Sequence, residues 1–361
     1  NEVVVVGYGT SKKSDVTGAI ASVSSKDFEK QPLTDVSKAI QGRAAGVQVR
    51  QTSGSPSGGF NIRIRGANSI TGGNDPLYVV DGQFISDLST VNVNDIQSME
   101  ILKDASATAI YGTRGANGVV LVTTKKGRSG KTKISVDVFK SISNVYKKLD
   151  LLSPSEFAEG VNFAEGQIFY TQAEIDALKV GGGEDWQDRL FSTGIANNAQ
   201  LSASGGSDTV DYYISGNLLN SSGTVVSQDY TRANLRVNLN AKLTDKFKIG
   251  VNFNGGFEKL IGDRADVSTG ISWDPTTPAY KADGTYNFLP IKSGVATASK
   301  NVLVAVENNI QDNNENRLAV NGYLNYDISK DLVFNSSAGI IKADAHNNSY
   351  NPFITSSIGI A

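Results

Sequence analysis

The chain has 361 residues, enough for two or three ordinary domains or for part of one large domain. Its 34 basic and 36 acidic side chains give a net charge of −2, so charge offers no argument for a nucleic-acid partner. There is no cysteine, and His346 is the single histidine, so disulfides, a thiol nucleophile, histidine-based triads and multi-histidine metal sites lack raw material. We therefore expect no catalytic residue, no metal and no cofactor; a pair of carboxylates of the kind that glycosidases use is the enzymatic alternative, and no spacing singles one out.

Composition leaves two kinds of β-protein open. Glycine is abundant (37 residues), proline is scarce (8), and 14 Phe and 13 Tyr lie among many polar residues. This mixture suits a wall with one lipid face and one wet face, and it also suits a soluble β-sandwich or adhesin. The longest strictly apolar run, Val302–Val306, is far shorter than the roughly 20 residues of a membrane helix. A helical membrane protein is therefore excluded.

The first 128 residues combine short strands with short helices. The β-branched run Val3–Val6 predicts an extended segment. Thr34 is the predicted cap of a helix over residues 35–41, and Asp104 the cap of a helix that runs through Tyr111 and ends at Gly112. Further strands are predicted at residues 16–23, 47–50, 61–65, 77–80 and 119–124. This mixture predicts one α+β domain.

Beyond Lys131 the sequence changes to long strands with alternating side chains. In the clearest example, apolar residues at the odd positions from Leu235 to Leu243 alternate with polar residues at the even positions from Asn234 to Lys242. Successive side chains of a strand point to opposite faces, so each strand has one apolar and one polar face. The residues expected to face lipid are Leu235, Leu239, Phe247, Val251, Leu318 and Leu324.

The connections between these strands are of two lengths. Residues 241–246 and 327–331 predict tight turns, whereas residues 145–196 and 261–313 form long joins, the first with a helix over Pro154–Glu165 capped by Ser153. Short turns at one end and long loops at the other are typical of an outer-membrane barrel. About seven such strands are present, and a barrel in lipid needs an even number with no open edge. The chain is therefore predicted to be part of a longer protein, or to be completed by a partner.

Several ordered motifs in the first 128 residues carry a family resemblance. They are Glu2–Gly9 (EVVVVGYG) with Lys12–Asp15, Ile40–Val49, Ile62–Gly66, Pro76–Gly82 and Met99–Gly127. Together they resemble the plug of the SusC/RagA family of TonB-dependent outer-membrane transporters. Beyond Lys131 the resemblance is looser, with similar residues at Asp185–Asp188 and Ser202–Gly206. The family's upstream periplasmic domain and most of its 22-stranded barrel have no counterpart in this sequence.

The resemblance implies an α+β plug domain followed by antiparallel transmembrane β-barrel strands, with the barrel incomplete in this chain. It divides the sequence into a TonB-box-like segment (residues 1–10), a plug (11–128) and the first strands and loops of the barrel (129–361). It implies energy-coupled import of an oligosaccharide or peptide across the bacterial outer membrane, and no enzyme. The implied partners are TonB, a SusD-like surface lipoprotein and the lipid bilayer. The alternative is a surface-binding or adhesin β-protein without transport.

The start of the chain resembles the segment that contacts TonB. An exposed, extended, valine-rich segment can add itself as a strand to the edge of a partner's sheet. The other interpretation is an ordinary buried first strand. The residues of this TonB-box-like segment are Glu2, Val3, Val4, Val5, Val6, Gly7 and Tyr8.

Three plug arginines are candidate latches between plug and barrel. Alternation places Arg63 and Arg65 on one face of a predicted strand, and Arg114 follows the predicted helix. Arginines inside a barrel need carboxylate partners, because burying an unpaired charge is costly. Glu100 and Asp104 could pair with them within the plug, and the alternative is that they are solvated surface charges.

Two turn-rich segments of the plug, residues 54–59 and 72–75, are candidates for ligand contact. The resemblance implies that such loops face the substrate cavity, whereas the plain alternative is a connecting turn. The candidate residues in and beside them are Ser53, Ser55, Ser57, Phe60, Asn68, Asn74 and Asp75.

Overall fold

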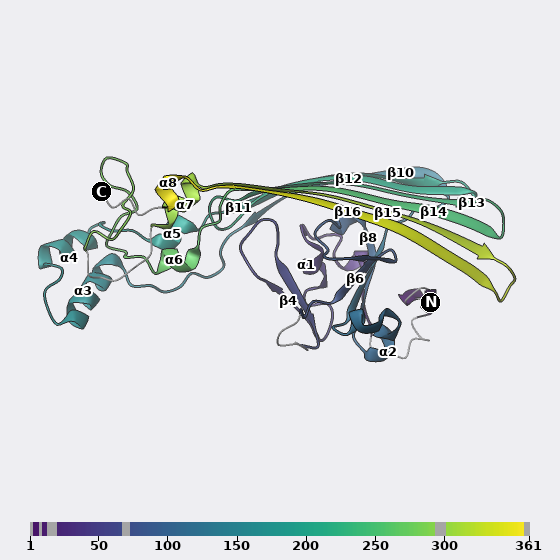
Figure 1. The fold of residues 1–361 in the computed structure, drawn as a ribbon, viewed down its shortest axis with the longest axis horizontal. Coiled ribbons are helices and arrows are strands. Elements are labelled where there is room, and N and C mark those ends of the chain that lie inside the picture. The colour runs from purple at the N-terminus through teal and green to yellow at the C-terminus, as the bar shows by residue number, and fades with distance from the viewer. Residues whose placement is uncertain (1–2, 7–8, 13–19, 67–72, 293–300, 357–361) are drawn as a thin grey trace.

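A long antiparallel sheet curves over a smaller α+β domain in the computed structural model, which describes residues 3–6, 9–12, 20–66, 73–292 and 301–356 (Figure 1). We call the sheet the wall and the smaller domain the plug. The wall has seven strands in chain order. They are β10 (Gly130–Ser143), β11 (Gly194–Gly206), β12 (Val210–Ser222), β13 (Asp229–Lys242), β14 (Phe247–Ile261), β15 (Ile310–Asp327) and β16 (Val333–Tyr350).

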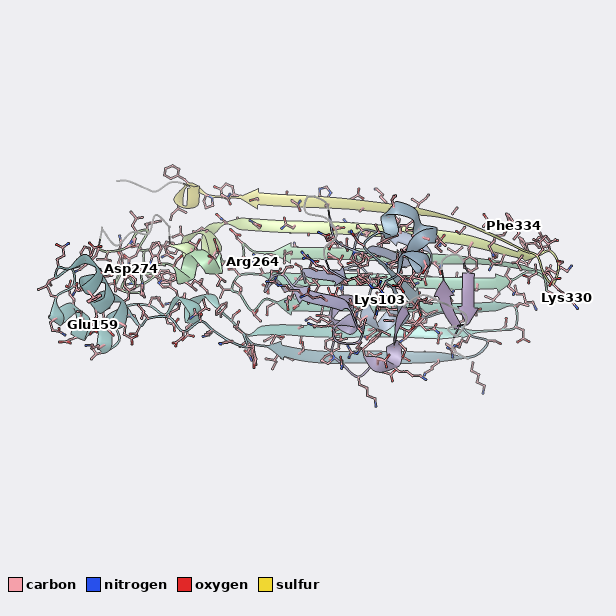
Figure 2. All side chains as sticks on the ribbon, turned by 90° about the horizontal axis from the view of Figure 1, so that it is seen from below. Lys103, Glu159, Arg264, Asp274, Lys330 and Phe334 are labelled. Carbon is pink, nitrogen blue, oxygen red and sulfur yellow. The ribbon has the colours of Figure 1, made fainter. Side chains whose placement is uncertain are left out.

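The two ends of the wall differ as the connection lengths predict. Residues 207–209, 243–246 and 328–332 make short turns at one end, and residues 144–193 and 262–309 form long connections at the other. Figure 2 shows Lys330 and Phe334 at the turn end, with Glu159 and Asp274 at the opposite end. The predicted tight turns and long joins are confirmed. The seven strands leave β10 and β16 as the two edges of the described sheet.

Period-two alternation gives the wall an apolar outer face and a polar inner face. Leu235 and Leu239 are 48% and 44% exposed, whereas Asn238 between them is fully buried against the inner side. Val251 and Leu318 lie on the outer face and are exposed, and Phe247 and Leu324 share that face and are half-buried. Strand pairing explains this arrangement. Leu235 pairs with Gly216 of β12 and Gly255 of β14, so outward-facing residues of neighbouring strands lie side by side.

The plug is built on a five-stranded sheet of order β3-β8-β9-β6-β7. The predicted strands at residues 77–80 and 119–124 are confirmed as the parallel neighbours β6 and β9. A separate hairpin of two strands, β4 and β5, packs against this sheet. Its apolar residues Ile62 and Ile64 belong to the same hydrophobic core as Met99 and Val120 of the sheet. The plug strands are β3 (Ile20–Ser24), β4 (Val47–Gln51), β5 (Phe60–Ile64), β6 (Leu77–Val80), β7 (Gln83–Ile85), β8 (Ile96–Leu102) and β9 (Val119–Thr124).

Strand β8 lies between β3 and β9 and was not predicted. Met99, Ile101 and Leu102 are all fully buried, so the end of the strand lacks the alternation that marks a half-exposed strand. Of the predicted strand at residues 16–23, residues 16–19 lie outside the described residues, and β3 begins at Ile20.

The two plug helices differ from the prediction in different ways, the first in its cap and the second in its length, since Asp104 is the cap of the second helix as predicted. Helix α1 spans Val36–Ile40, and its cap is Asp35, whose Oδ1 accepts a hydrogen bond from Ser37 N at 2.7 Å, so Thr34 as the cap is wrong. Helix α2 covers only Ala105–Thr108 and continues as a 3-10 segment over Ala109–Gly115. Gly112 breaks that segment with φ 59°, a conformation that glycine adopts without strain.

The long connections hold a second apolar core at the end of the wall. Trp186 and Trp273 pack edge to face with ring centroids 5.7 Å apart, beside the fully buried Leu190. Ser153 caps the predicted helix α3, Pro154–Glu165, which is confirmed. No helix among the described residues is long and apolar enough to cross a membrane. The other helices here are α4 (Gln172–Lys179), α5 (Trp186–Leu190), α6 (Val267–Ile271), α7 (Val302–Asn308) and α8 (Phe353–Ser356).

Candidate functional site at the interface of plug and wall

The plug contacts the wall mainly through residues 81–95, which we call the docking segment. It begins at the turn Asp81-Gly82, where both residues have positive φ, and it ends just before β8. Its side chains and carbonyls bond to residues of four wall strands, β11, β12, β13 and β15. The turn chemistry of Asp-Gly thus sets the start of the surface on which the plug rests.

A buried ion pair joins the docking segment to strand β13. Arg236 pairs with Asp81, and only 5% and 8% of the two side chains are exposed. Asp81 also accepts hydrogen bonds from the amide of Thr124 at 3.0 Å and from its hydroxyl at 2.6 Å. Three donors thus reach the carboxylate, and these bonds compensate for its burial.

Two further wall arginines contact the plug. Arg232 donates to the carbonyl of Ser89 at 2.8 Å and to the carbonyl of Thr34 at 3.1 Å. Arg317 on β15 approaches both oxygens of Asp87 at 3.1 Å. Burial alone would raise the pKa of Asp87, but hydrogen bonds from Ser89 and Ser86 and the charge of Arg317 together lower it below its ordinary value.

Uncharged wall side chains complete the interface. Gln200 on β11 accepts from Asn92 Nδ2 at 2.8 Å and donates to Asp95 Oδ1 at 2.8 Å, and Tyr213 on β12 donates its hydroxyl to the same oxygen at 2.8 Å. Burial raises the pKa of Asp95, against hydrogen bonds from Ser215 and Tyr213 that favour the charged form. The pKa values of Asp87 and Asp95, two of the three docking carboxyls, therefore shift in opposite directions.

A cavity of about 430 Å³ lies between the tip loop of the β4–β5 hairpin and the wall. Three predicted ligand-loop residues, Ser55, Ser57 and Phe60, line it, facing Arg232 and Tyr230 of β13. Their hydroxyl-rich loop is ordered by a hydrogen bond of 2.9 Å between Ser55 Oγ and Ser57 Oγ. Polar groups converging on a concave surface are what a ligand site needs.

The other loop candidates are placed differently. Ser53 lies in the same tip loop and its Oγ accepts from the amide of Ser55 at 3.3 Å. Asn74 and Asp75 lie in the second loop, which Asn117 holds by donating to the carbonyls of Gly73 at 2.9 Å and Asp75 at 3.4 Å. Asn68 lies outside the described residues. The structure thus brings the first loop to the cavity, and the second loop is not part of that cavity's lining.

Of the three predicted latch arginines, Arg65 and Arg114 contact other residues of the plug. Arg65 forms an ion pair with Asp104, one of the two carboxylates predicted as partners. The guanidinium of Arg114 lies 4.8 Å from the ring centroid of Phe84. Arg63 is exposed on β5. A latch role for these arginines toward further wall strands stays a prediction.

Sequence reasoning missed the wall arginines that hold the plug. Arg232, Arg236 and Arg317 all occupy inward-facing positions, and Arg236 stands in the alternating pattern as an ordinary polar residue. The available signal was a cation on the buried side of a strand, which needs a carboxylate or carbonyl partner. Alternation identifies the side of the strand but not the partner.

The start of the chain forms a hairpin of its own. Strand β1 (Val3–Val6) pairs antiparallel with β2 (Gly9–Lys12) in a two-stranded sheet separate from the five-stranded sheet of the plug. Val3–Val6 is thus extended, as predicted, whereas Glu2, Gly7 and Tyr8 lie outside the described residues. A role in contacting TonB stays a prediction.

No group of three or more His, Cys, Asp or Glu side chains among the described residues could hold a metal ion. The site is instead an interface at which the plug packs against the polar inner face of the wall. A model of the TonB-dependent receptor plug domain matches residues 12–119. TonB-dependent receptor P26 of Formosa agariphila is 38% identical, with 99% of this chain and 36% of the relative covered. The chain belongs to the SusC/RagA-type TonB-dependent receptors.

Two further comparisons support this assignment of the receptor. TonB-dependent receptor SusC of Bacteroides thetaiotaomicron is 35% identical over 80% of this chain and 29% of the relative. The RagAB peptide importer in its open-open state matches with a TM-score of 0.81 and 27% identity, covering 98% of this chain and 44% of that chain. This receptor chain therefore spans about a third of the length of the curated relatives it matches. Its place is the outer membrane, where the wall is an unclosed part of the barrel.

Proposed function

We propose that the chain forms the gate and part of the wall of a transporter that imports a large ligand, an oligosaccharide or a peptide, across the outer membrane. The observation that carries the proposal is the docking segment, which seats the plug on the inner face of four wall strands. These contacts are mostly hydrogen bonds and ion pairs between polar groups. Such an interface can open and close again with water replacing the lost bonds, which an apolar core cannot do without a large cost.

Energy coupling would act through the N-terminal hairpin. Strand β1 has β2 on one side, and no strand of the described structure pairs with its other edge. A strand of TonB could add to that edge through main-chain hydrogen bonds, which tolerate many side chains. A pull on this hairpin would then reach the plug through the chain that leads to β3.

The proposed partner at the other end is a SusD-like surface lipoprotein. The long connections place helices α3 to α7 at the end of the wall opposite the short turns (Figure 1). In an outer-membrane barrel that end lies outside the cell. The hydroxyl-rich cavity beside Ser55 and Ser57, between the tip loop of the plug hairpin and the wall, is the proposed contact site for the ligand.

The test of the proposal is Val4→Pro with Val6→Pro in the complete receptor. Proline removes an amide donor and fixes φ, so it prevents strand pairing at β1. We expect uptake to be abolished while barrel assembly and surface binding of ligand stay unchanged. The matched control, Val4→Ile with Val6→Ile, keeps both amides and should transport normally. Uptake at the full rate in the proline variant would instead favour a surface-binding protein without transport.

A further inference from the structure

The outer face of the β4–β5 hairpin carries a cluster of side chains that the docking of the plug does not use. Pairing places Gln48 opposite Arg63 and Arg50 opposite Asn61, so alternation directs all four to one face. With Thr52 they line a hollow of about 220 Å³. We call these five residues the arginine face of the hairpin.

The scaffold under the arginine face is rigid. The alternate residues of the same strands, Val49, Ile62 and Ile64, are 8%, 1% and 3% exposed and belong to the main core of the plug. Thr52 is fixed at the hairpin tip, where its hydroxyl donates to the carbonyl of Gly59 at 2.6 Å. The core therefore fixes the backbone positions from which the polar side chains above it extend.

The electrostatics of the face call for an anion. Arg50 and Arg63 are diagonal neighbours across the hairpin, a spacing of about 7–8 Å at the backbone that long side chains bridge. In the described part of the chain neither arginine pairs with a carboxylate, whereas Arg65, which directly follows β5, pairs with Asp104. Two like charges held side by side repel each other until an anion joins them.

The position of the face connects it to the ligand cavity. Gln51 and Phe60 of the same hairpin line the hydroxyl-rich cavity on the wall side. Arg50 and Asn61, the next pair away from the hairpin tip, line the hollow on the other side. A ligand that reaches the tip loop would therefore meet the arginine face next. The Oδ1 atom of Asn61 is buried without a hydrogen-bond partner in the described structure, so a hydroxyl donor would satisfy it.

We propose that Arg50 and Arg63 form a subsite for a carboxylate of the transported ligand, with Gln48, Asn61 and Thr52 bonding the neighbouring polar groups. The fork of a guanidinium matches a carboxylate with two parallel hydrogen bonds, which a lysine cannot supply. The inference rests on the proposed transport function. It deepens that function by selecting acidic ligands over neutral ones.

The experiment uses the complete receptor purified in detergent and measures binding by calorimetry. Tetragalacturonate and a tetraglutamate peptide present carboxylates on a sugar and on a peptide, and maltotetraose and tetra-alanine are their neutral partners. We expect one acidic probe to bind at least tenfold more tightly than its neutral partner, and the probe that does so identifies the source of the carboxylate. Arg50→Gln with Arg63→Gln should remove that preference, and Lys30→Gln, an exposed charge elsewhere on the plug, should keep it.

A charge-retaining variant separates binding from folding. Arg50→Lys with Arg63→Lys should keep the protease resistance of the plug and bind the acidic probe more weakly than the parent, because an ammonium cannot bond a carboxylate bidentately. The proposal is overturned by equal binding of acidic and neutral probes, or by unchanged affinity in the glutamine variant. It is also overturned if the glutamine variant loses only the protease resistance of its plug, since the arginines would then pair with the wall. Binding without uptake would refute transport and leave this subsite standing.

Discussion

Arg236 of wall strand β13 and Asp81 of the plug form an ion pair in which 5% and 8% of the side chains remain exposed. Asp81 follows β6 directly, and its carboxylate also accepts from the amide and hydroxyl of Thr124 at the end of β9. One carboxylate thus ties the two parallel strands of the plug to the wall. Because each charge is buried with its partner, loss of either leaves the other without compensation.

We expect Arg236→Ala to weaken the docking of the plug by about 3–5 kcal/mol, because Asp81 would stay buried and unpaired. The measurement is the urea concentration at which the plug of the complete receptor becomes sensitive to protease. Arg236→Ala with Asp81→Ala should cost less than the sum of the two single changes, since no lone charge remains.

The matched control for this prediction is Arg317→Ala. Its partner Asp87 is 44% exposed, so water screens the pair and its loss should cost about 1 kcal/mol or less. Equal effects of Arg236→Ala and Arg317→Ala would show that burial does not decide the strength of these contacts.

The apolar outer face of the wall predicts a strong asymmetry between faces. Leu235→Arg should destabilise the folded receptor in lipid vesicles by about 2–4 kcal/mol, as for an arginine at mid-membrane. Asp137→Arg is the control, because Asp137 is exposed on the inner face of the wall, whereas Leu235 lies on the outer face. Asn238 is unsuitable, since it is fully buried and its amide bonds to Asn252. Similar unfolding free energies for the two variants would contradict a lipid-facing Leu235.

Acid should release the contact between Asp87 and Arg317. The pKa of Asp87 is lowered when the plug is docked. Its contribution to docking is therefore fully present above the ordinary pKa of an aspartate and is lost as pH falls through the lower docked pKa. The same protease assay between pH 6 and pH 2 should show this loss. Asp87→Asn should flatten the curve on the acid side.

Asp95 provides a control of opposite sign for the same measurement. Its pKa is raised by burial, so protonation as pH falls through the docked value relieves a penalty and favours docking. Asp95→Asn should remove that gain.

If Asp87→Asn leaves the pH profile of docking unchanged, the ion pair with Arg317 does not hold the plug.

Local signals in the sequence determined much of the architecture. Alternation from Leu235 to Leu243 assigns the two faces of β13, and Ser153-Pro154 marks the start of α3. The turn pair Asp81-Gly82 ends β6 at Val80. These features depend on residues within a few positions of one another, so pattern and propensity suffice to predict them. The ordered plug motifs added the family.

The partners across the interface were decided by the tertiary structure alone. Strand β8 is hidden in the sequence because both of its faces are covered at its end, which removes the alternation. Arg236 and Asp81 stand 155 positions apart, and nothing near either residue names the other. The sequence predicted arginines of the plug that bind the wall. The arginines that join the two parts in the described structure belong to the wall and bind the plug. Composition supplies the charges, but only the packing of the plug on the wall brings each one to its counter-charge.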